Sequence, residues 1–317
     1  MDVSIIIVNY NTKQLLADCL NSIYEQTRDI DFEVIVSDNG STDGSIEMLK
    51  QGFPQVILIE NNANLGFGAA NNRGLSIAKG KYIFYLNSDT ILLNNAVKYF
   101  FDYWEENGEK ENLGALGCNL LDSEGNINSS YANFPDINKN IADLIRANYG
   151  LWKLLVKKIF CKKNPDISKK KDFYKKKLGE VDFVVGADLF AKNDSFARFD
   201  ENIFLYCEEV DLQYRMAKHS KRRLLIENPL IVHLEGQSSK TQKFLHFEEL
   251  TSFSSKCKNI SRIYYYKKNI SRIKAFFVKV LTVIMWLNPL IFRYNYKAII
   301  PLIKNKISHN DIKLLKC

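Results

Sequence analysis

The feature that most constrains the fold is the apolar run Tyr82–Leu86, which ends abruptly in Asn87, Ser88 and Asp89. An apolar run without polar alternation is typical of a strand that is covered on both faces of a sheet. Open α/β sheets bind their ligands at the carboxyl ends of such strands. This position predicts that Asp89 holds a divalent metal, although the same residues could form only a loop or a helix N-cap.

Segments with strand character alternate with segments of helical spacing through the first ninety residues. Alternation of this kind predicts an α/β fold, with a doubly wound sheet that has right-handed crossovers and is flanked by helices. The expected strands are Val3–Val8, Glu33–Ser37, Val56–Glu60 and Tyr82–Leu86, and the expected helices are 13–26, one from Ile46, and 69–78.

A polar residue occurs in each loop that follows one of these strands: Asn9, Asp38, Asn64 and Asp89. Because the carboxyl ends of parallel strands meet at one edge, we expect these loops to share a polar site. The sequence has neither a dinucleotide fingerprint after the first strand nor a P-loop. The loop at Asn64–Gly68 can still offer backbone N–H groups and a helix N-terminus to an anion.

Three carboxylates, Glu208, Glu209 and Asp211, open a predicted helix that continues through Lys218. Their mutual repulsion is costly unless a cation or a reacting proton offsets it, which favours a catalytic role. The alternative is a solvated acidic first turn that the helix dipole stabilises. A short strand further on ends in His233, a residue type that is often structural when it stands alone.

Positive charge is concentrated in the last quarter of the chain. Residues 241–317 carry 15 Lys and Arg against 3 Asp and Glu, a balance of +12, and eleven lysines lie in Lys153–Lys177. Such blocks point to an anionic surface, either a membrane or a nucleic acid. The lysine block lacks interleaved aromatic residues and any known nucleic-acid module, so we expect no nucleic acid as a partner.

From Ala275 to Phe292 only Lys279 is charged. The stretch barely reaches the roughly 20 residues that a membrane-spanning helix needs. We expect an in-plane amphipathic helix, with a packed core helix, a homodimer element or a true span as the alternatives. The six cysteines are scattered and the N-terminus lacks the basic start of a signal peptide, which favours a cytosolic compartment.

Taken together, the motifs resemble those of the inverting nucleotide-sugar glycosyltransferases of the GT-A fold, glycosyltransferase family 2. The branch to which they are most similar includes bacterial rhamnosyl- and galactofuranosyltransferases. The resemblance covers roughly residues 3–239 and rests on seven pieces in order: Ser4–Asn11, Val36–Ser45, Asn64–Asn71, Leu86–Thr90, Gly186-Ala187, Phe204–Leu212 and Val232-His233.

The resemblance implies a role for each site residue. Asp38 would contact the nucleotide base, in a pocket that Tyr10 and Asn11 line. Residues Asn64, Gly66 and Asn71 would border the ribose and diphosphate. At the metal, Asp89 would be the last residue of an Asp-x-Asp motif and His233 would complete the shell. Glu209 would be the catalytic base, and Glu208 and Asp211 would support the acceptor end.

The chain departs from the family pattern at two positions. Asn87 replaces the first Asp of the metal motif, so one strong anionic ligand remains for Mg²⁺ or Mn²⁺. Glu209 stands where Asp is commoner, which leaves open whether Glu208 or Glu209 is the base. The Gln-x-x-Arg-Trp motif of processive synthases is absent, so the resemblance implies transfer of one sugar per visit.

The predicted organisation is a GT-A domain over residues 1–240 and a helical, membrane-associating region over 241–317. Within the domain, 1–120 would bind the nucleotide, 135–178 would be a lysine-rich insertion, partly helical, and 181–240 would form the acceptor half. The implied donor is dTDP-rhamnose or a UDP-sugar, and the acceptor is a glycan or a polyprenyl-diphosphate-linked glycan. We expect a cytoplasmic protein, peripheral on the inner face of a bacterial cell membrane, that builds surface polysaccharide. The alternative is a nucleotide-binding module without activity.

Overall fold

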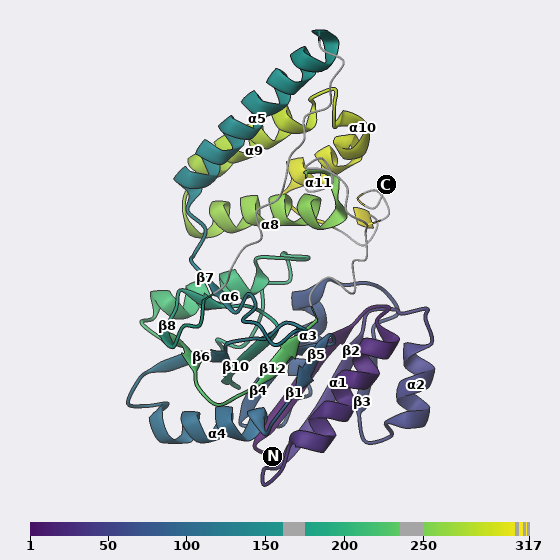
Figure 1. Cartoon of the computed structure of the whole chain (residues 1–317), viewed down its shortest axis with the longest axis vertical. Coiled ribbons are helices and arrows are strands. Elements are labelled where there is room, and N and C mark those ends of the chain that lie inside the picture. Colours follow the sequence, from purple (N-terminus) through teal and green to yellow (C-terminus); the bar gives the residue numbers. More distant parts are fainter. Residues whose placement is uncertain (161–174, 235–249, 308–310, 313–314, 316–317) are drawn as a thin grey trace. The chain divides into compact units, whose positions relative to one another are not determined.

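The structure is a computed structural model that describes residues 1–160, 175–234, 250–307, 311–312 and 315. The chain forms two compact units, traced in Figure 1. The first comprises Met1–Phe134, Phe173–Asp200 and Glu208–Lys240, and the second comprises Pro135–Asp172, Glu201–Cys207 and Thr241–Cys317. The domain division predicted at residue 240 stays a prediction.

An eight-stranded sheet forms the centre of the first unit (Figure 1). Strand β1 is parallel to β2 and β4, and β2 is parallel to β3, whereas β10 runs antiparallel to β4. The predicted α/β fold is therefore confirmed, and its sheet is mixed. The strand order is β3 (Ile57–Glu60), β2 (Phe32–Asp38), β1 (Val3–Asn9), β4 (Tyr82–Asn87), β10 (Asp188–Lys192), β6 (Leu113–Cys118), β11 (Arg222–Ile226) and β8 (Gly179–Glu180).

Helices cover both faces of this sheet, which explains the unbroken apolar runs of its strands. Ile5 and Phe84 pack into one apolar cluster with residues of α1 (Lys13–Gln26), α2 (Ser45–Gly52) and α4 (Ala96–Asn107). Their neighbours Ile6 and Tyr85 point to the other face and pack with residues of α3 (Phe67–Leu75) and α6 (Glu208–Lys218). Alternate residues of one strand thus enter two different cores.

Two small strand pairs extend the carboxyl side of the sheet. Strand β5 (Thr90–Leu92) pairs with β12 (Ile231–His233), which sets His233 opposite Thr90. Strand β7 (Tyr131–Ala132) pairs with β9 (Phe183–Val184). The first pair brings the end of β12 beside the Asn87–Thr90 loop, although the two segments are far apart in sequence.

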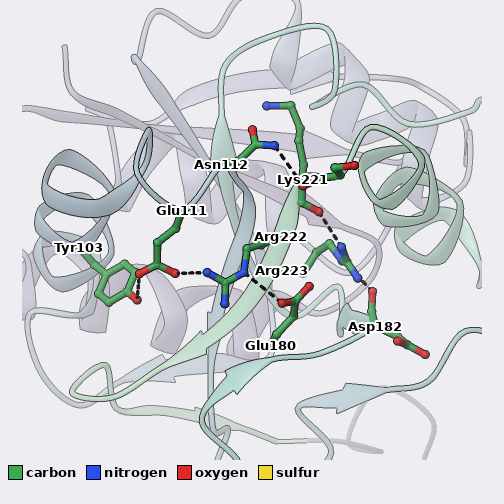
Figure 2. A network of polar contacts seen from close by, with 9 residues as sticks. Tyr103, Glu111, Asn112, Glu180, Asp182, Lys221, Arg222 and Arg223 are labelled. Carbon is green, nitrogen blue, oxygen red and sulfur yellow. Dashed lines mark hydrogen bonds and ion pairs between the residues drawn. The ribbon is translucent and has the colours of Figure 1, made fainter.

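A network of ion pairs fastens the opposite end of the sheet (Figure 2). The guanidinium of Arg222 donates to Glu111 Oε2 at 2.7 Å and to Glu180 Oε2 at 3.0 Å. Tyr103 donates to the same Glu111 carboxylate at 3.1 Å. Because Arg222 pairs with Leu113 at the amino ends of β11 and β6, this network stabilises the sheet away from the polar loops.

The second unit is helical. Its described elements are α5 (Ile137–Phe160), α8 (Phe253–Asn269), α9 (Arg272–Trp286), α10 (Phe292–Asn295), η1 (Tyr296–Ala298) and α11 (Ile299–Lys304). Helix α9 packs against both α5 and α8. Ser271 separates α8 from α9, because its hydroxyl caps α9 by accepting from the Lys274 backbone N–H at 3.3 Å. Within the described ranges, the helices lack the length and apolarity that crossing a membrane requires.

Candidate functional site

The loops after β1 and β2 are joined by a buried hydrogen bond. Asn9 Nδ2 donates to Asp38 Oδ2 at 2.7 Å and to Ser41 Oγ at 3.0 Å. Asp38 Oδ1 accepts from the backbone N–H groups of Gly40 and Ser41 at 2.9 and 2.8 Å. Both oxygens of this fully buried carboxylate are therefore used to shape the loop. Whether Asp38 also contacts a base stays a prediction.

The loop after β3 is tied to the same cluster through Asn39. Its side-chain amide donates to the Gly66 carbonyl at 3.2 Å and its oxygen accepts from Asn61 at 3.1 Å. Asn64 Oδ1 accepts from the Gly66 N–H at 3.0 Å. Gly66 has φ of 89°, a left-handed conformation that favours glycine, and helix α3 begins at the next residue. The amino end of α3 therefore opens at the polar edge of the sheet.

The loop after β4 completes the set. The Thr12 hydroxyl donates to Asn9 Oδ1 at 2.7 Å and shares a hydrogen bond of 2.9 Å with the Ser88 hydroxyl. Four loops from β1, β2, β3 and β4 are thus connected by side-chain hydrogen bonds, as the positions of Asn9, Asp38, Asn64 and Asp89 predicted. We call this connected edge the polar rim.

Asp89 and His233 converge at one end of the polar rim. Asp89 Oδ1 lies 3.4 Å from His233 Nε2, and Asn87 Nδ2 lies 3.4 Å from the same nitrogen. The His233 backbone pairs with Thr90, and the Leu234 N–H donates to the Asp89 carbonyl at 2.9 Å. One strand pairing and one backbone hydrogen bond therefore hold the carboxylate and the imidazole together.

This pair fits a divalent cation. A carboxylate oxygen and an imidazole nitrogen are ligands that Mn²⁺ accepts, and neighbouring ligands of one small cation lie roughly 3 Å apart. Two protein ligands leave the other positions for oxygen atoms of a bound molecule or water. Among the described residues, His, Cys, Asp and Glu form no group of three or more that could hold a metal.

Asp188 belongs to this region, and the sequence analysis did not select it. Its Oδ2 accepts from the Cys118 N–H at 2.7 Å, while Oδ1 is buried with no hydrogen-bond partner among the described residues. Burial raises the pKa of Asp188 to about 7, and the nearby His233 charge acts in the opposite direction. The signal that could have identified it is its place between Gly186-Ala187 and the apolar run Leu189–Ala191.

The acidic helix α6 begins beside the amino end of α3. A Cβ atom at Gly68 would lie 3.5 Å from the Cβ of Glu208, and one at Gly186 would lie 3.6 Å from the Cβ of Glu209. Gln213 fixes the helix, because its side chain accepts from the Val184 N–H at 2.8 Å and donates to the Val184 carbonyl at 2.7 Å. The amino end of α6 therefore packs close to Gly68 and Gly186.

Glu208 and Glu209 have different environments. Glu208 is 4% exposed, and its Oε2 has no hydrogen-bond partner among the described residues. Burial, with a smaller contribution from the Glu209 charge, raises the pKa of Glu208 well above its usual value. Glu209 is half-buried. An ionised carboxylate is therefore more accessible at Glu209 than at Glu208.

The remaining predicted residues take varied positions. Asn11 Oδ1 accepts from the Thr42 N–H at 2.7 Å, so this side chain holds the Ser41-Thr42 turn. Asn71 Nδ2 donates to the Phe67 carbonyl within α3 at 3.1 Å. Asp211 is fully buried, with Oδ2 lying 3.4 Å from Arg215 Nε. Tyr10 is half-buried after β1. Their predicted roles stay predictions.

Comparisons with known proteins give a family match in the first half of the chain. Residues 4–156 match the model of the family described as Glycosyl transferase family 2. It is 36% identical over 121 residues to a poly(ribitol-phosphate) beta-glucosyltransferase of Bacillus spizizenii, covering 37% of this chain and 19% of that protein. It is 33% identical over 129 residues to glycosyltransferase GlyG of Streptococcus pneumoniae, covering 39% and 42%.

A solved structure shares the fold across the whole chain. It is the mannosyltransferase PcManGT from Pyrobaculum calidifontis, in complex with GDP-Man and Mn²⁺, with 15% identity and a TM-score of 0.50. The match covers 99% of this chain and 78% of that one. The chain spans less than half the length of the curated relatives described above. The expected GT-A fold is confirmed, and residues 4–156 match the family model that the resemblance implied. The rhamnosyl- or galactofuranosyl-type branch stays a prediction.

Proposed function

We propose that this chain is an inverting glycosyltransferase that moves one sugar from a nucleotide-diphospho-sugar to a glycan or lipid-linked acceptor. The observation that carries the proposal is the convergence of Asp89 and His233 at the end of β4, within a family 2 domain. Carboxyl ends of the strands are where open α/β sheets bind ligands. The polar rim and the acidic end of α6 then supply the two halves of the reaction.

The polar rim is assigned to the donor. Tyr10, Asn11 and Asp38 would surround the base, and the backbone N–H groups at the start of α3 would face the diphosphate. Asp89 and His233 would hold Mg²⁺ or Mn²⁺, with Asn87 beside them. A bound divalent cation offsets the negative charge that develops on the departing diphosphate. The complex of PcManGT with GDP-Man and Mn²⁺ supports this assignment by analogy of fold.

Glu209 is assigned as the base. Its carboxylate takes the proton of the acceptor hydroxyl while that oxygen forms a bond to the anomeric carbon of the sugar. The bond from that carbon to the diphosphate oxygen breaks in the same step, so the configuration inverts. Glu208, whose pKa is raised, would be protonated and would donate a hydrogen bond near the acceptor. Asp211 would hold the helix through Arg215.

The proposed donor is dTDP-rhamnose or a UDP-sugar, and the proposed process is bacterial surface polysaccharide synthesis. The glucosyltransferase of Bacillus spizizenii, named for poly(ribitol phosphate), supports a polymer of the cell envelope as the context. We place the protein in the cytoplasm, peripheral on the membrane that carries polyprenyl-linked acceptors. The basic balance of residues 241–317 supports that location.

The test is a donor panel with dTDP-rhamnose, UDP-galactose, UDP-galactofuranose, UDP-glucose and GDP-mannose. Release of nucleoside diphosphate is measured with Mn²⁺ or Mg²⁺, with and without a crude lipid-linked acceptor. We expect one donor to be consumed faster than the others, and the product to show the inverted anomeric configuration by NMR. Absence of release from every donor, with and without the acceptor, contradicts the proposed activity.

The second candidate is a nucleotide-binding module without activity, favoured by the amide of Asn87 where the family motif has a carboxylate. The two candidates differ in one measurement. A module would show thermal stabilisation by a donor or by its nucleoside diphosphate, yet release no nucleotide in the panel. The buried Glu208 and the accessible Glu209 favour the enzyme, because paired carboxylates are costly to keep without a use.

A further inference from the structure

We propose that α5 and α9 together form a single surface that docks on an anionic phospholipid membrane. This inference rests on the peripheral membrane location proposed above and extends it. The sequence predicted the membrane-associating region in 241–317, whereas the surface described here draws about half of its residues from 137–156.

Helix α9 has an exposed face made of large apolar side chains. At about 100° per residue these positions fall within an arc of about 100°. Ile273, at 72%, is the most exposed large apolar side chain among the described residues. The opposite face, with Ala275, Val278 and Trp286, is buried. The exposed apolar residues are Ile273, Phe276, Phe277, Val280, Ile284 and, directly after the helix, Leu287.

Helix α5 carries a second apolar stripe. Ile145, Tyr149, Trp152 and Val156 are all exposed and follow one another at intervals of four, three and four residues. This spacing keeps them on one face of the helix. Leu144 and Leu151, on the opposite side, are buried. Both helices therefore leave their apolar stripe uncovered.

Two hydrogen bonds fix how α5 and α9 lie against each other. Lys274 Nζ donates to Asn138 Oδ1 at 2.9 Å, and Asn148 Nδ2 donates to the Leu281 carbonyl at 3.1 Å. The first bond joins residues near the amino ends of the two helices, and the second joins residues further along both. The helices therefore run parallel and side by side (Figure 1).

The same contacts place the two stripes on one side of the helix pair. Successive residues are rotated by about 100° around a helix axis, and we count this rotation as positive toward higher residue numbers. On this count the centre of the α5 stripe lies about 70° ahead of the contact residue Asn148. The centre of the α9 stripe lies about 90° behind the contact residue Leu281. Because the helices are parallel, these opposite rotations turn both stripes toward the same side of the pair. The result is one continuous apolar surface.

Basic residues border this surface along α5 and at the beginning of α9. Lys139, Arg146 and Lys153 recur every seven residues along the outer flank of α5, and Arg272 lies on the outer flank of α9. On the described part of the pair the only acidic side chain is Asp143, which lies 2.9 Å from Arg146. Cations beside an apolar face suit the headgroup region of an anionic leaflet. A second copy of the chain would instead bring like charges together.

Tryptophan fluorescence gives a direct readout, because the three tryptophans are distinct. Trp104 and Trp286 are buried, whereas Trp152 lies in the α5 stripe and is 46% exposed. Insertion into a lipid interface would shift the Trp152 emission to shorter wavelength. The full chain is titrated with phosphatidylcholine vesicles that contain or lack phosphatidylglycerol, at low and high salt, and flotation of the protein is measured in parallel.

Two double variants test the two helices separately. Tyr149→Gln with Val156→Gln changes α5 and keeps Trp152, while Phe276→Gln with Ile284→Gln changes α9. The matched control, Ile77→Gln with Leu93→Gln, removes exposed apolar residues of the first unit. Circular dichroism confirms that each variant is folded. We expect each helix variant to lower partition to anionic vesicles by about ten-fold, and the control to bind like the wild type.

The outcomes are separable from those of the proposed activity, since nucleotide release from a soluble donor needs no vesicle. Wild-type binding to anionic vesicles, with a blue shift of Trp152 and loss at high salt, supports the inference. If the α5 variant binds anionic vesicles as well as the wild type does, the shared surface is overturned and α9 is the only helix of the pair that contacts the membrane. An emission that changes with protein concentration but not with vesicles overturns the lipid partner in favour of a second copy.

Discussion

Two adjacent glutamates at the start of α6 differ in burial, and their proposed roles rest on that difference. Glu208 is enclosed and its pKa is raised by burial, whereas Glu209 is half-buried and lies beside Gly186. The sequence left open which of them is the base, because two neighbouring residues of the same type carry no signal of their burial. The environment of each side chain favours Glu209.

We expect Glu209→Gln to lower kcat by about 10²-fold or more while donor binding is kept, because the amide cannot accept the acceptor proton. Glu208→Gln should have the smaller effect, since a protonated Glu208 and a glutamine both donate hydrogen bonds. The two variants are compared as a matched pair, with kcat taken from steady-state rates and donor affinity from calorimetry. A larger loss in Glu208→Gln would move the base to that residue.

The raised pKa of Asp188 predicts how the stability of the folded protein depends on pH. Its pKa in the folded protein is about 7 instead of the ordinary 3.8, so the folded state prefers the protonated form. Stability is therefore highest below the ordinary pKa and falls as the pH rises toward 7, by at most about 4 kcal/mol. We expect Asp188→Asn to remove this fall, because the amide does not ionise and its oxygen can still accept from Cys118.

Urea unfolding of both proteins in EDTA, at about pH 5 and about pH 8, checks this expectation. The wild-type midpoint should drop more than that of the variant between the two values. Equal drops in the two proteins would mean that Asp188 is ionised at little cost in the folded state.

At the scale of elements, the sequence predicted much of the first unit. Buried runs such as Tyr82–Leu86 and helical spacing in residues 13–26 appear in the structure as β4 and α1. Further along, the apolar segment that begins at Val181 forms two strands, β9 and β10. The expected helix 69–78 begins earlier, at Phe67, because Gly66 supplies the turn before it. Helix ends depend on such backbone details more than on periodicity.

The polar rim was predicted only in outline. Asn and Asp at the ends of neighbouring strands indicated a shared site, but the contact between Asp89 and His233 depends on the pairing of β5 with β12. Pairing between segments so distant in sequence leaves no local pattern. The same reason explains why Asp188 was missed, since its importance comes from its burial beside Cys118.

Close packing of α3 on β1 gives a prediction at this scale. A Cβ atom at Gly74 would lie 2.6 Å from Ile6 Cγ2, a contact that requires the helix or the strand to shift. We expect Gly74→Ala to lower the free energy of unfolding by about 1–3 kcal/mol. The control is Gly52→Ala in α2, where no atom lies within 4 Å, and thermal unfolding of both variants gives the comparison. Equal stabilities would mean that α3 is loosely packed.

At the scale of the whole molecule, the chain combines a sheet unit and a helical unit. The lysine-rich segment 135–178 supplies α5, which packs against α9 in the second unit. Sequence reasoning did not connect these segments, because more than a hundred residues separate them. The side chains of much of the lysine block, and the turn-rich loop after His233, lie outside the described residues.

Removal of residues 260–317 should separate the functions of the two units. We expect the shortened chain to leave the membrane fraction, to release nucleotide from the soluble donor, and to transfer poorly to a lipid-linked acceptor. Fractionation and the two assays measure these properties. Because the deletion also uncovers the buried side of α5, the point variants of α5 and α9 serve as the control. Flotation of the shortened chain equal to that of the full chain would contradict this division.

The central claim is that Asp89 and His233 hold a divalent cation against the donor diphosphate. Its most direct test is nucleotide release by the wild type and by Asp89→Ala, with Mn²⁺ or with EDTA, beside the control Glu106→Ala in the exposed part of α4. We predict that EDTA stops release by the wild type and that Mn²⁺ restores it. Asp89→Ala should stay inactive with a native circular dichroism spectrum, and Glu106→Ala should match the wild type. Release that is unchanged in Asp89→Ala and indifferent to EDTA would contradict the account.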